Sequence, residues 1–288
     1  MKKQLFNMYL LPMLFFLIIL GCEDRSIPVC TSQSFVLRPQ EYANLVEQAN
    51  NGDKDAAWRI YNHYSMGLQN DAAQEEIWLR KSAKLSHHEA QRWMAYMIKE
   101  NNWKPGEFGK SASVAVRSLL QASADFNSSA CYELAECYET GYFGIMDLKA
   151  ARMYYEKAAK LGNTMAWKRV SEYFFKGMGG GKDISGAYFW ISLDALCVDP
   201  RSVGGKEIES RRQEIEKELS LAELENIWPK IDSFIQQVRR GAVKIDTPPF
   251  HEGMVAKNVS DEGRRIADSN EQTRRARLRH QSRMISKP

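Results

Sequence analysis

The sequence predicts an all-α solenoid built from stacked helical pairs. The main indication is an anchor alanine that opens an apolar helical stripe and recurs after 34, 40 and 36 residues. In three copies a glycine follows 11 residues later, and an aspartate then precedes a second apolar stripe. Because one helical pair buries little apolar surface alone, copies with this period must stack on one another. The anchor alanines are Ala56, Ala90, Ala130 and Ala166.

The first helix of each copy is predicted from the spacing of its apolar residues. In every copy, large apolar side chains follow the anchor alanine at positions +4 and +8, so that all three lie on one helical face. Glycine at +11 suits the left-handed conformation that commonly ends a helix. We therefore predict that conformation at Gly67, Gly141 and Gly177.

The second helix of each copy is predicted to begin after an aspartate. A carboxylate at this position accepts hydrogen bonds from backbone N–H groups that have no partner within the helix. Asp71, Asp147 and Asp183 occupy it in the first, third and fourth copies. The second copy departs from the pattern, because Ala112 replaces the capping aspartate and Asn101 replaces the glycine.

These residues resemble the Sel-one-like repeat family, whose members are related to tetratricopeptide repeats. The third copy is the best match, and its run from Lys157 to Gly162 (KAAKLG) is characteristic of that family. The resemblance implies a right-handed α/α solenoid of helix-turn-helix repeats with capping helices. It also implies a binding scaffold and not an enzyme, and it transfers no catalytic residue, metal or cofactor to this sequence.

The predicted solenoid occupies residues 41–198. It begins with an orphan helix at 42–50, and residues 205–241 are expected to cap its other end. Ser220 and Glu223 form a capping box that opens the last of these helices. The four repeats are predicted at 53–86, 87–126, 127–162 and 163–198.

The N-terminus resembles a bacterial lipoprotein signal. Two lysines precede a short apolar run that ends at Gly21 and Cys22. A membrane-spanning helix needs about 20 apolar residues, more than this run provides. The resemblance implies a signal peptide at 1–21, lipid attached to Cys22, and a tether at 22–40. The chain would then be anchored facing the periplasm, and Glu23 favours the outer membrane over the inner.

Four further cysteines allow three complete disulfide pairings, and the sequence does not choose among them. They are Cys30, Cys131, Cys137 and Cys197. A bridge between Cys131 and Cys137 is disfavoured, because the two lie six residues apart on one predicted helix and face different directions.

Two short motifs suggest chemistry but fit the repeats better. The run from Gly177 to Lys182 lacks the spacing of a phosphate-binding loop, and it lies where a repeat turns between its helices. His87 and His88 are adjacent and point about 100° apart on a helix, so they do not easily share one metal ion. The sequence therefore predicts no metal site and no cofactor.

A partner-binding surface is predicted on the concave side, at positions +2 and +6 from the anchor alanines. Tryptophan, tyrosine and arginine are the types most enriched at binding hot spots. The alternative is that Trp58 and Tyr132 complete the packing between repeats. The candidates are Trp58, Asn62, Arg92, Tyr96, Tyr132, Glu136, Lys168 and Glu172.

Residues 248–288 are predicted to form a flexible basic tail. From Val255 to Pro288, nine basic residues stand against four acidic ones. The tail is either solvated or in contact with anionic phospholipid or an acidic partner. Because the positive charge belongs to the tail and not to the folded part, the composition does not favour nucleic-acid binding. The candidate contacts are Arg264, Arg265, Arg274, Arg275, Arg277 and Arg279.

Together these features predict a membrane-anchored periplasmic scaffold that binds another protein. Some lipoproteins resembling this one are immunity proteins, which neutralise a toxic effector such as a phospholipase. An inhibitor of this kind is the first hypothesis. An envelope assembly or host-interaction adaptor is the alternative, and a cell-wall or β-lactam hydrolase is a distant third.

Overall fold

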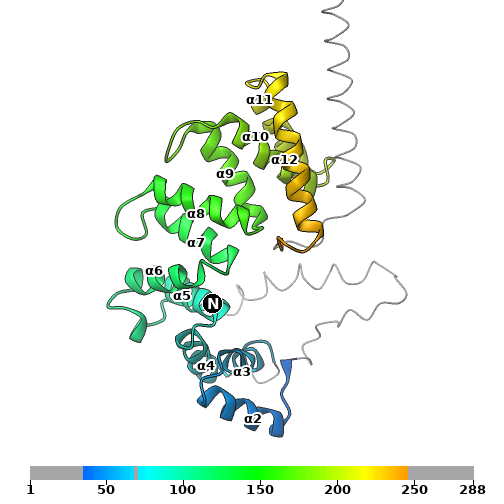
Figure 1. Cartoon of the computed structure of the whole chain (residues 1–288). Coiled ribbons are helices and arrows are strands. Elements are labelled where there is room, and N and C mark those ends of the chain that lie inside the picture. The colour runs from blue at the N-terminus through cyan, green and yellow to red at the C-terminus, as the bar shows by residue number, and fades with distance from the viewer. Residues whose placement is uncertain (1–34, 68–70, 246–288) are drawn as a thin grey trace, which may run out of the picture.

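The computed structural model describes residues 35–67 and 71–245, which form a stack of α-helices (Figure 1). This part of the chain contains no strand, so the predicted all-α fold class is confirmed. None of its helices is long and apolar enough to cross a membrane. The predictions for Cys22, Cys30 and the tail arginines lie outside the described residues.

Four helical pairs follow one another along the stack. They are α3 (Lys54–Met66) with α4 (Ala72–Lys84), α5 (His88–Glu100) with α6 (Ala112–Ser123), α7 (Ser128–Glu139) with α8 (Leu148–Lys160), and α9 (Thr164–Lys176) with α10 (Ile184–Cys197). From α2 to α11, each helix packs on the next one in the chain, as a solenoid requires, and α12 packs on α10. The α5–α6 connection contains a short 3₁₀ helix, η3 (Gly106–Phe108).

Further helices flank the pairs. Helix α2 (Pro39–Asn50) precedes them and starts three residues before the expected orphan helix. Leu37 is buried, and the His63 ring lies 3.2 Å from its backbone nitrogen, so this end of the expected tether packs on the fold. Helices α11 (Val203–Glu216) and α12 (Leu221–Arg239) follow α10, and the capping box of Ser220 and Glu223 is present.

The anchor alanines are buried where the first helix of each pair packs, with exposed fractions of 3% or less. Each also donates its backbone N–H to the side chain three residues earlier, at 2.9–3.2 Å. These regular N-caps of the first helices were not predicted from the sequence. The capping side chains are those of Asp53, His87, Asn127 and Asn163.

The caps of the second helices were mostly predicted correctly. The side chains of Asp71, Asp147 and Asp183 each accept a hydrogen bond from the first turn of the following helix. The second copy is corrected, because Ser111 takes this place and its hydroxyl accepts from the N–H of Val114. The cap is therefore kept one residue before Ala112, and only the residue type has changed.

The three glycines at position +11 do not all have the same backbone conformation. Gly141 and Gly177 adopt the predicted left-handed conformation, with φ of 71° and 70°. The prediction is wrong at Gly67, where φ is −80°. A Cβ atom at Gly67 would lie 2.0 Å from the carbonyl oxygen of His63, so glycine is needed there for a close approach of two backbone segments.

Three described cysteines are free thiols: Cys131, Cys137 and Cys197. Cys131 and Cys137 are not bonded to each other. Both are fully buried, and burial raises the pKa of each thiol to about 11. A thiol with so high a pKa is protonated at neutral pH and is a poor nucleophile, so these cysteines act as small core residues.

Candidate functional site

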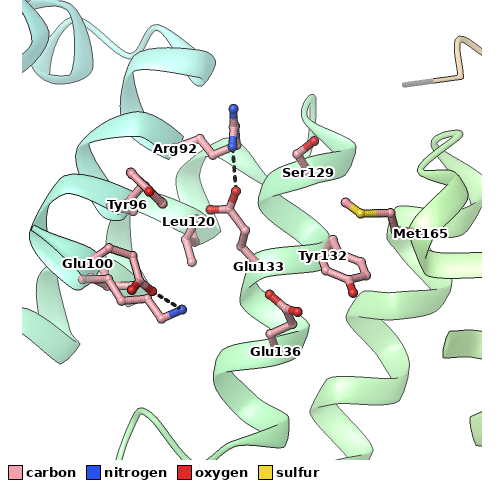
Figure 2. A pocket seen from close by; sticks show the side chains of 12 residues that line it. Arg92, Tyr96, Glu100, Leu120, Ser129, Tyr132, Glu133, Glu136 and Met165 are labelled. Carbon is pink, nitrogen blue, oxygen red and sulfur yellow. Dashed lines mark hydrogen bonds and ion pairs between the residues drawn. The ribbon is translucent and has the colours of Figure 1, made fainter. Parts of the chain in front are cut away.

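A groove with a volume of about 540 Å³ lies between the second and third helical pairs. Helix α5 forms one side and α7 the other, and small or aliphatic residues of α5 and α6 line its base (Figure 2). Met165, at the start of α9, lies at its far end and is 59% exposed. The groove is lined by Arg92, Ala95, Tyr96, Lys99, Glu100, Val116, Leu120, Ser129, Tyr132, Glu133, Glu136 and Met165.

Four of the eight predicted surface residues meet in this groove: Arg92, Tyr96, Tyr132 and Glu136. They occupy positions +2 and +6 on two neighbouring first helices, which the stacking of repeats brings side by side. Tyr96 is 41% exposed and presents its ring to solvent. The ring of Tyr132 packs edge-on against buried Tyr155 at 5.3 Å, so it is held by the core while it lines the groove.

The other four predicted residues do not line the groove. Trp58 is stacked between Tyr61 and His87, with ring centroids 4.8 Å from each, which is the packing alternative considered for it. Asn62 is half-buried on α3. Lys168 pairs with Glu207 of α11 at 2.8 Å, and Glu172 receives Arg169 and Lys176.

One ion pair crosses the groove and joins its two walls. The Arg92 guanidinium on α5 donates to Glu133 on α7 at 2.6 Å (Figure 2), and it also lies 3.2 Å from Glu89. Burial raises the pKa of Glu133, while Arg92 acts in the opposite direction. Lys99 lies 3.0 Å from its neighbour Glu100. Both basic residues of the groove therefore already have a carboxylate partner.

Glu136 is the acidic residue of the groove without such a partner. Within the described ranges, no basic group lies at ion-pair distance from its carboxylate, and the nearby cations act on it only from further away. Burial raises the pKa of Glu136, while Lys99 and a hydrogen bond from Tyr132 lower it. The groove thus offers one carboxylate without an ion-pair partner beside Tyr132, and Tyr96 lines the same groove.

A polar network behind Tyr132 stiffens this wall. The carboxylate of Glu139 accepts hydrogen bonds from the hydroxyls of Tyr155 and Tyr173, both at 2.8 Å, and it also pairs with Arg169. The Arg169 guanidinium lies over both tyrosine rings, 5.4 and 5.8 Å from their centroids. Burial and the bond to Glu139 raise the pKa of Tyr155, so its hydroxyl remains a donor. The network joins α7, α8 and α9 into one rigid support.

Groove residues that were not predicted include Lys99, Glu100, Ser129 and Glu133 on the same two helices, and Met165 on α9. A signal was present on α7, because Ser129, Tyr132, Glu133 and Glu136 follow the spacing of one helical face. Met165 precedes an anchor alanine and could be found only from the stacking of α9 on the third pair.

The structure gives structural roles to the two motifs that suggested chemistry. His87 caps α5 through Nδ1, and burial lowers its pKa, so that the neutral ring accepts the N–H of Ala90. Residues 177–182 form the turn between α9 and α10, where Asp183 caps the next helix. Within the described residues, no group of three or more His, Cys, Asp or Glu side chains is arranged to hold a metal ion.

Comparison with solved structures bears on the fold. A protective antigen of uropathogenic Escherichia coli strains, described as displaying an SLR fold, matches with a TM-score of 0.53 and 18% identity, over 74% of this chain and 45% of that one. A Sel1 repeat protein from Oxalobacter formigenes matches with a TM-score of 0.50 and 21% identity, over 59% and 49%. This chain has a Sel1-like repeat (SLR) fold.

Sequence comparison agrees with the SLR fold. The ERAD-associated E3 ubiquitin-protein ligase component HRD3 of Candida glabrata is 25% identical over 220 residues, which are 74% of this chain and 23% of that protein. No family model matches the sequence. This SLR chain spans less than half the length of each of these three similar proteins.

Proposed function

We propose that this SLR chain is a scaffold that binds another protein through the groove between α5 and α7. The observation that carries the proposal is the composition of the groove, which combines exposed aromatic and methionine side chains with an arginine and an unpaired carboxylate. Such side chains are typical of binding hot spots. HRD3 is by name a component of a larger ligase, so a role in assembly has a precedent in a similar protein.

The groove residues are expected to contribute strongly to partner affinity. Tyr96→Ala and Met165→Ala should each weaken binding about tenfold, because each removes an exposed side chain that lines the groove. Isothermal titration calorimetry with a partner identified by pulldown measures the change. Met153→Ala is the matched control, since Met153 is 54% exposed on α8 but lies outside the groove. Equal losses for both methionine variants would place the binding surface elsewhere.

The narrower proposal is that the partner is a toxic effector, such as a phospholipase, which this protein inhibits. A scaffold that covers an effector needs affinity and no chemistry of its own, and the buried thiols of Cys131 and Cys137 are unsuited to catalysis. Periplasmic expression should then rescue cells that export the effector, and Tyr96→Ala should weaken the rescue. Rescue that fails while the partner still binds would favour an envelope or host-interaction adaptor. Hydrolysis of a β-lactam by the purified protein would favour the enzyme alternative.

We also propose that the protein is anchored in the bacterial envelope through lipid on Cys22, facing the periplasm. Cells grown with labelled palmitate should incorporate the label into the wild-type protein, and Cys22→Ser should abolish incorporation and release the chain into the soluble periplasmic fraction. Cys30→Ser is the control, because it changes a nearby cysteine outside the lipoprotein-like run. Label retained in the Cys22→Ser variant would contradict the proposal. Density-gradient separation of the membranes tests the preference for the outer membrane.

A further inference from the structure

The last described residues fold back onto the solenoid at the α8–α9 turn. After α12 the chain turns at Gly241, and the backbone of Lys244 and Ile245 lies directly on Gly162 in the α8–α9 turn. A Cβ atom at Gly162 would lie 2.1 Å from the carbonyl oxygen of Lys244, so only glycine permits this contact. Gly162 precedes Met165, which lines the groove, by three residues. The described chain therefore ends near the start of α9, the helix that contributes Met165 to the groove.

The segment beyond Ile245 is rich in arginine, which complements the carboxylates and tyrosine rings of the groove. Beyond Ile245 the chain continues for 43 residues, and seven arginines lie between 264 and 283. The groove holds three carboxylates, of which Glu136 has no ion-pair partner among the described residues, and it holds two tyrosine rings. A guanidinium can pair with a carboxylate and stack on an aromatic ring at the same time.

We propose that residues 264–283 of the chain bind in its own groove, with an arginine at Glu136 between Tyr96 and Tyr132. The 19 residues from Ile245 to Arg264 span up to about 60 Å when extended, which is ample for this reach. A tethered segment acts at an effective concentration on the order of millimolar, so weak contacts suffice to hold it. This inference rests on the function proposed above: a partner that binds the groove must first displace the tail.

Photo-cross-linking in the full chain tests the contact without any partner. A benzoylphenylalanine placed at Tyr96 is expected to cross-link to peptides from 264–283 at the mass of one chain. The same probe at Ile77, which is 54% exposed on α4, is the control and should give no such product. Tail peptides captured equally from both positions, or only at the mass of two chains, would refute the proposal.

Three further variants identify the contacts. Glu136→Gln, and replacement of the six arginines from Arg264 to Arg279 by glutamine, should each reduce the Tyr96 product at least fivefold. Gly162→Ala should also reduce it, because the new Cβ displaces Lys244. Gly52→Ala is its matched control, since φ is +96° at Gly52 and +95° at Gly162, but a Cβ at Gly52 meets nothing within 4 Å. An unchanged product in the arginine variant would contradict the proposal.

The outcome also separates this inference from the proposed function. If the tail fills the groove nine-tenths of the time, the arginine variant should bind a partner about tenfold more tightly. Cross-links to the tail without any partner affinity would support the inference and contradict the function. If the Tyr96 probe never captures the tail, and the arginines instead determine binding to phosphatidylglycerol vesicles, the tail is a membrane contact and this inference is wrong.

Discussion

Replacing Trp167 with alanine is expected to lower the free energy of unfolding by about 4 kcal/mol. Trp167 on α9 is fully buried, and its indole N–H donates to the carbonyl oxygen of Ala159 on α8 at 3.1 Å. Its ring also meets Phe234 of α12 edge-on, with centroids 6.0 Å apart. The substitution thus removes a large apolar side chain from the place where two helical pairs and the cap meet.

Urea denaturation followed by circular dichroism measures this loss. Trp167→Phe should cost about 1–2 kcal/mol, because it keeps most of the apolar surface and loses the hydrogen bond. Trp58→Ala is a second comparison, since Trp58 is only half-buried and its loss should cost less. Hydrogen exchange should show α9 and α12 opening first, because a solenoid transmits stability only between neighbours. A loss below 1 kcal/mol for Trp167→Ala would show that α12 is not stabilised through this residue.

The helical pairs were predictable because each repeat carries the same pattern of apolar, small and capping residues. Every helical pair needs a small residue where helices approach closely, and the anchor alanines supply it once in each repeat, 34 to 40 residues apart. The N-caps of the first helices were equally regular, three residues before each alanine, yet the sequence analysis missed them. Asp, His and Asn all accept a backbone N–H, so the conserved property is the acceptor and not the residue type.

The groove was only partly predictable, for a different reason. Positions on one helix follow from its period, and so Arg92, Tyr96, Tyr132 and Glu136 were selected together. Which of them keep free surface depends on neighbours in the next repeat. Trp58 has the same position as Arg92, but it stacks on His87 of the following repeat and is used in packing. No local pattern distinguishes these two outcomes.

The ion pair of Glu133 was likewise not predictable from the sequence. Its position on α7 was visible in the sequence, but its partner Arg92 lies 41 residues away on α5. A single sequence offers no means to pair two charged residues across repeats, since the distance between copies varies with the insert in the second repeat. The unpaired state of Glu136 could therefore be recognised only when the partners of both other groove carboxylates were known.

Replacing Asp194 with asparagine is expected to stabilise the protein by up to about 3 kcal/mol at pH 8. Asp194 on α10 is 8% exposed, and burial raises its pKa from 3.8 to about 6. Lys168 acts in the opposite direction, but its ammonium group pairs with Glu207 at 2.8 Å. The fold therefore holds a carboxylate that is more stable protonated than ionised, and asparagine removes the cost of burying its charge.

The pH dependence of the stability gain distinguishes removal of the buried Asp194 charge from a general improvement in packing. Between pH 4 and pH 6 the unfolded chain loses the Asp194 proton while the folded chain keeps it, so this residue's contribution to stability falls as pH rises and is constant above pH 6. The difference between the Asp194→Asn variant and the wild type should accordingly be near zero at pH 4 and largest above pH 6. Urea titrations at several pH values measure it, and Asp199→Asn, at an exposed acid nearby, is the control. A stability difference that does not change with pH would show that Asp194 ionises normally in the folded protein.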